Sequence, residues 1–160
     1  VLLHAYLPTA EYNTLLRSST YAVNTSHGEG QCLPLMEYMS AGKPAVAPRH
    51  TAMLDYLTPE NAFIVDSSPE PGTWPHDQRQ VFRTLRQRVH YQALVRAYRC
   101  SYQVARHEPE VYAAMSAAAT MALQHYCSME VVRTRLQQFV NARLSATLVN
   151  TPDARHVDSV

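Results

Sequence analysis

The first third of the chain alternates short apolar runs with helical patterns, and this alternation limits the folds open to it. Four apolar runs are present, at residues 2–7, 20–24, 44–47 and 62–66. Helical patterns separate them, at residues 8–18, 33–41 and 52–57. Short apolar strands separated by helices are typical of βαβ units, whose strands run parallel beneath covering helices. The sequence therefore predicts an α/β fold with a partial parallel sheet in residues 1–66.

The pattern changes after residue 66. The stretch "SSPEPGTWPHD" contains three prolines and a glycine, which predicts a loop over residues 67–78. Residues 79–143 show no strand pattern and predict C-terminal helices at 79–106, 109–126 and 128–143. Pro109 suits the first turn of a helix, and Ser128 suits an N-cap. From residue 144 to 160 the pattern fades, and we expect a flexible tail.

Charge and cysteine content restrict the classes of function. A net charge of +1 gives no electrostatic reason to expect nucleic acid or an anionic membrane as partner. No apolar run approaches the roughly 20 residues of a membrane span. The three cysteines are odd in number and widely spaced, which argues against a disulfide framework and a structural metal site. These features favour a cytoplasmic protein.

One stretch, "SHGEGQCLPLMEYMSAGKP" at residues 26–44, carries more than packing information. It joins a predicted strand to a predicted helix, and α/β proteins bind ligands in loops of this kind. Pro34 is suited to the helix start, while Gly28 and Gly30 let a ligand approach the backbone. Free N–H groups at this helix start would form an anion site for a diphosphate. We expect these groups from Gln31, Cys32, Leu33 and Leu35.

Two carboxylates, Glu29 and Glu37, lie eight positions apart across this junction. We expect Glu37 in about the first turn of the helix, with its side chain leaning back toward the ligand. A carboxylate accepts two hydrogen bonds at once, which suits the adjacent hydroxyls of a ribose. Glu29 is placed to accept from a sugar beyond the phosphates. His27 has two interpretations, as a donor to phosphate or sugar and as a loop histidine satisfied by the protein.

The same stretch resembles the E-x7-E region of retaining glycosyltransferases with the GT-B fold, glycosyl transferases group 1. The family pattern is approximately S-x-x-E-G-F-G-L-P-x-x-E-A-M-A-x-G-x-P-V. The resemblance covers about residues 2–66, and Asp55 falls where the family has an acidic residue. The positions that match in register are Ser26, Glu29, Gly30, Leu33, Pro34, Glu37, Met39, Gly42 and Pro44.

This resemblance implies that the parallel sheet is a partial Rossmann-like sheet, the C-terminal half of a GT-B domain, followed by a helical segment. It also implies hexosyl transfer from a nucleotide-diphosphate sugar to an acceptor, with retention of anomeric configuration. Glu29 and Glu37 would be the catalytic residues, with Glu37 on the donor ribose and Glu29 on the donor sugar. The donor-binding set would be His27, Gly30, Gln31, Cys32, Leu33 and Glu37. The family uses no metal or other cofactor, and its activity belongs to carbohydrate biosynthesis.

The resemblance also implies partners. The chain corresponds to the C-terminal, donor-binding half, so one partner would be the remaining N-terminal part of the enzyme. We expect this chain alone to be inactive. The acceptor would be a saccharide or lipid-linked, with peripheral membrane contact as among relatives that use lipid acceptors. No nucleic acid is expected.

Departures from the pattern keep other interpretations open. Gln31 and Cys32 replace an aromatic residue and a glycine, and residues 49–51 replace a glycine pair. The family's Arg/Lys pair has no evident counterpart, since Lys43 and Arg49 are not obvious substitutes. A degenerate, non-catalytic nucleotide-binding or scaffolding module is the first alternative. A nucleotide-sugar epimerase is another, and nucleic-acid binding by an arginine-rich helix is the most distant.

Overall fold

The computed structural model describes residues 6–73, 76–81 and 83–149, without the side chains of residues 145–149. The chain divides into two compact units, of which the first ends at Tyr126 and the second begins at Cys127. Among the described residues, no helix is both long and apolar enough to cross a membrane.

The first unit contains the predicted parallel sheet. Its strands are β1 (Ala22–Val23), β2 (Ala45–Pro48) and β3 (Ala62–Val65), and their order in the sheet is β1-β2-β3. Both strand pairs are parallel, with Ala22 opposite Ala45 and Ala45 opposite Ala62. The prediction of an α/β fold with a parallel sheet is thereby confirmed. Of the run expected as a strand at residues 2–7, residues 2–5 lie outside the described residues, and residues 6 and 7 form no strand.

One helix precedes these strands and two connect them, at about the places that the sequence pattern predicts. They are α1 (Thr9–Ser18), α2 (Leu33–Ser40) and a short 3-10 helix, η1 (Thr51–Asp55). The centre of the core is fully buried because apolar side chains of strands, α2 and η1 meet there. Its side chains at 0 or 1% exposure include Met39, Val46, Met53, Leu57 and Val65.

Two longer helices complete the helical part of this unit, α3 (Tyr91–His107) and α4 (Pro109–Cys127). Ala93 and Ala97 of α3 pack in one buried cluster with Val46 and Val65, which places this helix against the sheet. α4 begins at Pro109, as expected from the missing N–H of proline.

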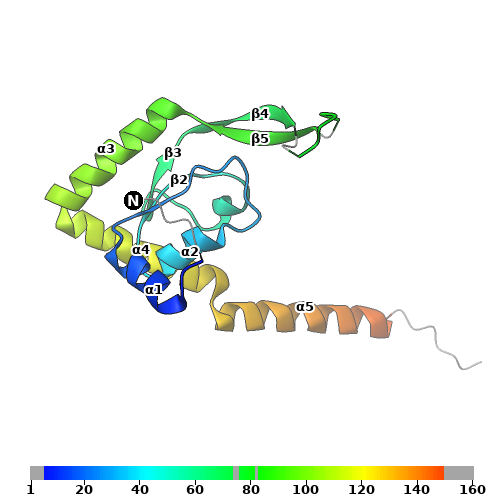
Figure 1. Cartoon of the computed structure of the whole chain (residues 1–160). Coiled ribbons are helices and arrows are strands. Elements are labelled where there is room, and N and C mark those ends of the chain that lie inside the picture. Colours follow the sequence, from blue (N-terminus) through cyan, green and yellow to red (C-terminus); the bar gives the residue numbers. More distant parts are fainter. Residues whose placement is uncertain (1–5, 74–75, 82, 150–160) are drawn as a thin grey trace, which may run out of the picture. The chain divides into compact units, whose positions relative to one another are not determined.

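The expected loop at 67–78 is wrong for residues 67–73, and the helix expected from residue 79 is wrong at its start. Residues 67–73 form β4 (Ser67–Thr73), which pairs antiparallel with β5 (Arg83–Val89). The first long helix therefore starts at Tyr91 rather than at residue 79. Figure 1 shows β3 leading into this hairpin and α3 following it.

The hairpin tolerates two prolines because of its register. Pro69 lies opposite Gln87, and Pro71 lies opposite Leu85. The Gln87 N–H points away from β4, since it donates to the His27 carbonyl oxygen at 2.7 Å. Pairing alternates along an antiparallel ladder, so both prolines occupy positions that need no N–H toward β5.

The second unit contains α5 (Met129–Val149), which extends beyond the predicted end of this helix at residue 143. The expected flexible tail is therefore wrong for residues 144–149, and its residues 150–160 lie outside the described residues. Ser128 caps the helix as expected, because its Oγ accepts from the Val131 N–H at 3.3 Å.

Candidate functional site

The loop of residues 24–32 leaves the end of β1 and enters α2. It lies at the carboxyl edge of the parallel sheet, the edge at which open α/β sheets bind ligands. η1 follows β2 and reaches the same loop, because the Thr51 Oγ1 accepts from the Glu29 N–H at 3.0 Å. The Ala52 N–H adds a 3.4 Å bond to the Glu29 carbonyl oxygen. η1 thus holds both the N–H and the carbonyl oxygen of Glu29.

The Glu29 side chain is half-buried and turned toward the protein. Its Oε1 accepts a 3.2 Å hydrogen bond from Asn24 Nδ2, the same amide that lies 2.9 Å from the Cys32 sulfur. Asn24 Oδ1 accepts from the Ser26 N–H at 2.7 Å, which closes a tight turn directly after β1. Asn24 therefore fixes the start of the loop, the Glu29 carboxylate and the start of α2 together.

Cys32 is the N-cap residue of α2 and adopts a left-handed conformation, with φ of 59°. It is 5% exposed. Burial raises the pKa of its thiol, and the Leu35 backbone N–H opposes that shift. The predicted donor-binding residues Gly30, Gln31 and Leu33 are exposed beside it.

The backbone N–H groups at this junction are available to a ligand. Within the described part of the chain, no acceptor is paired with the N–H of residues 30, 31, 32 or 33. A Cβ added at Gly28 or Gly30 would meet no atom within 4 Å, so the space over the loop is open. Unpaired amides at a helix N-terminus favour an anion.

A buried histidine, His50, forms a hydrogen bond with the backbone of the loop. His50 is 4% exposed, and its Nε2 lies 3.1 Å from the Ser26 carbonyl oxygen. Because a carbonyl can only accept, Nε2 carries the proton and Nδ1 accepts from Thr51 Oγ1 at 3.1 Å. Burial lowers the pKa of His50, which keeps the ring neutral in this arrangement. Ser26 Oγ is buried beside it without a hydrogen-bond partner in the described residues.

Glu37 is the fifth residue of α2, one position beyond the first turn in which it was expected. Its side chain is exposed, and its Oε2 accepts a 2.5 Å hydrogen bond from Tyr12 Oη of α1. This bond raises the pKa of Tyr12 to about 12, with smaller contributions from burial and from the Glu37 charge.

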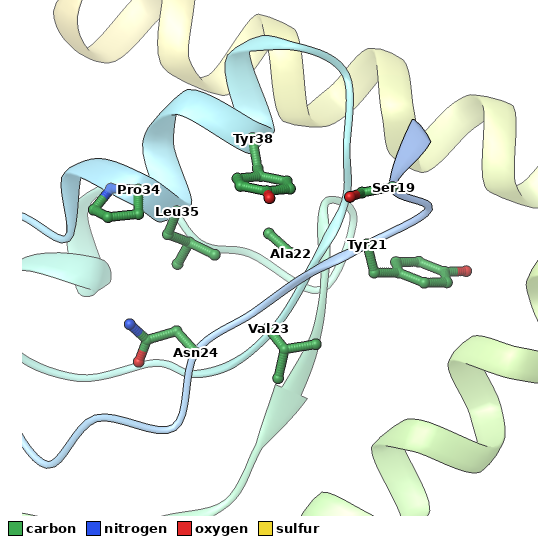
Figure 2. Close-up of a pocket in the computed structure, with 8 residues that line it drawn as sticks. All are labelled: Ser19, Tyr21, Ala22, Val23, Asn24, Pro34, Leu35 and Tyr38. Atoms are coloured by element: carbon green, nitrogen blue, oxygen red, sulfur yellow. The ribbon is translucent and has the colours of Figure 1, made fainter. Parts of the chain in front are cut away.

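A pocket of about 340 Å³ lies between β1 and α2, beside the outer strand of the described sheet. Figure 2 shows Asn24 and Pro34 on one side of it, and Ser19 and Tyr21 on the other. Its other lining residues are Ala22, Val23, Leu35 and Tyr38. Asn24 joins this pocket to the loop, since the same amide reaches Glu29 and Cys32.

The basic residues nearest in sequence are engaged elsewhere. Lys43 Nζ donates to the Arg17 carbonyl oxygen at 3.0 Å. Arg49 donates from Nε to the Leu57 carbonyl oxygen at 2.7 Å and from Nη2 to that of Leu54 at 3.3 Å. Both cations therefore hold main-chain carbonyls. Among the described residues, no three His, Cys, Asp or Glu side chains gather as metal ligands would.

The other predicted residues of this region take mainly backbone roles. The His27 side chain is exposed, and its carbonyl oxygen binds the Gln87 N–H of β5 at 2.7 Å. The Gln31 carbonyl oxygen accepts from Tyr56 Oη at 3.0 Å. Asp55 accepts from Tyr126 Oη at 3.2 Å, so its carboxylate faces α4.

Sequence reasoning missed the residues that hold this loop and the Glu37 side chain in place. Tyr12 binds Glu37, and the loop is held by Asn24, His50, Thr51 and Tyr56. Asn24 had one detectable signal, its place at the end of a predicted strand. Each of the other four binds a residue that lies between 22 and 25 positions away along the chain, and local sequence patterns do not indicate such contacts. Comparison of the sequence with protein-family models and with curated proteins finds no match.

Proposed function

We propose that the chain supplies the donor-binding part of a retaining glycosyltransferase, in the second half of a Rossmann-like domain. The enzyme transfers a hexose from a nucleotide-diphosphate sugar to a saccharide or lipid-linked acceptor. The observation that carries this proposal is the junction of β1 and α2, where unpaired N–H groups of residues 30–33 lie between Glu29 and Glu37.

The amides supply what a diphosphate needs. As the bond between the sugar and the diphosphate breaks, negative charge grows on the leaving phosphate oxygens. Fixed N–H groups and the positive end of α2 stabilise that charge without reorganising. Open space at Gly28 and Gly30 gives the phosphates access to the backbone.

The two carboxylates supply hydrogen-bond acceptors for the hydroxyls of the ribose and of the donor sugar, which flank the diphosphate. Glu37 is exposed and has one oxygen, Oε1, that is free of the Tyr12 bond, so it can accept from a ribose hydroxyl. Asn24 donates to Oε1 of Glu29. The second carboxylate oxygen, Oε2, is suited to accept from a sugar hydroxyl. In this role Glu29 orients the sugar.

The experiment titrates the 160-residue chain with UDP, GDP, ADP and their sugar conjugates, and ligand-observed NMR measures the binding. Wild type should bind one of these nucleotides, and Glu37→Ala should lose at least about tenfold in affinity, the worth of a hydrogen bond to a charged group. Glu60→Ala removes a fully exposed carboxylate next to the start of β3 and is the control. Wild type that binds no nucleotide would overturn the proposal.

A second candidate is a nucleotide-binding module without transferase activity. Specific observations favour it: Lys43 and Arg49 both hold main-chain carbonyls rather than facing the loop. Tight nucleotide binding, with neither sugar transfer nor donor hydrolysis by the complete enzyme, would select this candidate. Transfer that Glu29→Ala abolishes would exclude it.

A further inference from the structure

We infer that Tyr12 positions Glu37 and makes this pair selective for a ligand with two adjacent hydroxyls, that is, for ribose over 2′-deoxyribose. The inference rests on the proposed function and adds to it a residue and a specificity. Tyr12 belongs to α1 and Glu37 to α2, so only the folded chain brings the phenol to the carboxylate.

The contact is a hydrogen bond between a neutral donor and a charged acceptor. Tyr12 Oη lies 2.5 Å from Glu37 Oε2, and the two residues are 25 positions apart. Bonds of the O–H···O⁻ kind are short and about twice as strong as neutral ones. An exposed glutamate otherwise samples several side-chain rotamers, so the phenol selects one of them.

This geometry leaves a defined set of acceptors. Glu37 Oε1 keeps both of its lone pairs, and the Tyr12 oxygen can still accept a hydrogen bond while it donates to Oε2. Two adjacent hydroxyls can then donate to two fixed acceptors, one on each residue. A ligand with a single hydroxyl uses only one of them and leaves the other to water, so it gains one hydrogen bond fewer.

The protonation state of the Tyr12 phenol agrees with its role as a donor to Glu37. The pKa of Tyr12 is raised to about 12, chiefly by the hydrogen bond to Glu37, so the phenol keeps its proton at neutral pH. It therefore donates to the carboxylate throughout the range in which a nucleotide would bind.

The test compares binding of the ribose and 2′-deoxyribose forms of UDP, GDP and ADP to wild type and Tyr12→Phe. Wild type should prefer the ribose form of the nucleotide that it binds by at least about tenfold. Tyr12→Phe should bind that form roughly three- to tenfold more weakly and lose most of the preference. Tyr98→Phe, which removes a hydroxyl exposed on α3, is the matched control.

The outcomes separate the two proposals. Binding by wild type that Tyr12→Phe leaves unchanged, with the preference for ribose intact, would overturn the role of Tyr12 and leave the proposed function standing. Wild type that binds none of the six nucleotides would overturn both.

A measurement without nucleotide tests the contact itself. The Tyr12 phenol, labelled with ¹³C and titrated by NMR, should show a raised pKa of about 12 in wild type. Glu37→Gln should bring this pKa back toward the ordinary value of 10.0. An ordinary Tyr12 pKa in wild type would show that the phenol does not hold the carboxylate, and would overturn the inference.

Discussion

Asn24 donates one side-chain amide to two neighbours, Glu29 Oε1 at 3.2 Å and Cys32 Sγ at 2.9 Å. This amide connects the end of β1, the loop carboxylate and the N-cap of α2. The three groups belong to a single stretch, residues 24–32, which joins the strand to the helix. The loop is therefore held by the side chain of the residue that follows β1.

We predict that Asn24→Asp destabilises the chain by about 1–3 kcal/mol at pH 7. The new carboxylate would still accept from the Ser26 N–H, but it would present an oxygen to Glu29 where the amide donates. The loss should shrink below about pH 4, where carboxyl groups protonate. Urea denaturation measures it. Thr25→Asp adds the same charge at a neighbouring position, and equal stability of the two variants would contradict the prediction.

Gly42 ends α2 in a left-handed conformation, with φ of +75°. Its N–H binds the Met39 carbonyl oxygen at 3.0 Å, and the Lys43 N–H binds that of Tyr38 at 2.9 Å, which together form a Schellman motif. An added Cβ would come within 2.9 Å of Ser116 Oγ, which donates to the Gly42 carbonyl oxygen at 2.6 Å.

Gly42→Ala should therefore lower the free energy of unfolding by about 1–3 kcal/mol, from backbone strain and the displaced serine. Gly28→Ala is the control, because its Cβ meets no atom within 4 Å, and it should change stability by less than about 0.5 kcal/mol. Thermal or urea denaturation of both variants checks the prediction. A Gly42→Ala protein as stable as Gly28→Ala would show that the helix end does not require glycine.

The buried His50 makes stability depend on pH. Its folded-state pKa lies below the ordinary value of 6.5 because burial disfavours the charged ring. Above about pH 6.5 the ring is neutral in both states, and its contribution is complete. As the pH falls below that value, the unfolded chain takes up a proton that the folded chain resists, so stability declines until the folded-state pKa is passed.

Urea denaturation between about pH 5 and pH 8 tests this sign. Wild type should lose more stability on acidification than His50→Gln, which has no ring to protonate. At about pH 8 the variant should already be weaker by about 1–3 kcal/mol, because Thr51 and Ser26 lose their buried partner. His107→Gln removes an exposed histidine as the control. Parallel pH profiles for wild type and His50→Gln would refute the role of this ring.

Local patterns predicted much of the first unit. The end of α2 near residue 41, just before Gly42, and the start of α4 at Pro109 each depend on the backbone of one residue, and sequence reveals such properties. The apolar runs indicated the parallel strands, because the strands lie in a sheet that helices cover. The fold class and the position of the candidate loop both follow from these signals.

The hairpin could not be predicted in the same way. Pro69 and Pro71 are ordinarily loop signals, and they are tolerated only because the register turns them away from β5. Glu70 is paired with Arg86 at 2.9 Å and Arg88 at 3.5 Å, contacts that exist only after the strands align. Side-chain bonds between α1 and α2, and between η1 and the loop, likewise depend on tertiary packing. Periodicity along one segment carries no record of such contacts.

The cysteines should differ in reactivity according to their surroundings. Cys32 is 5% exposed, and burial raises the pKa of its thiol, so both access and thiolate content are low. Cys100 is exposed on α3. We predict that iodoacetamide at about pH 8 alkylates Cys100 at least about tenfold faster than Cys32, as measured by peptide mass spectrometry. In urea the two rates should converge. Equal rates in the native chain would mean that the loop of residues 24–32 opens readily and does not hold Cys32 at the N-cap of α2.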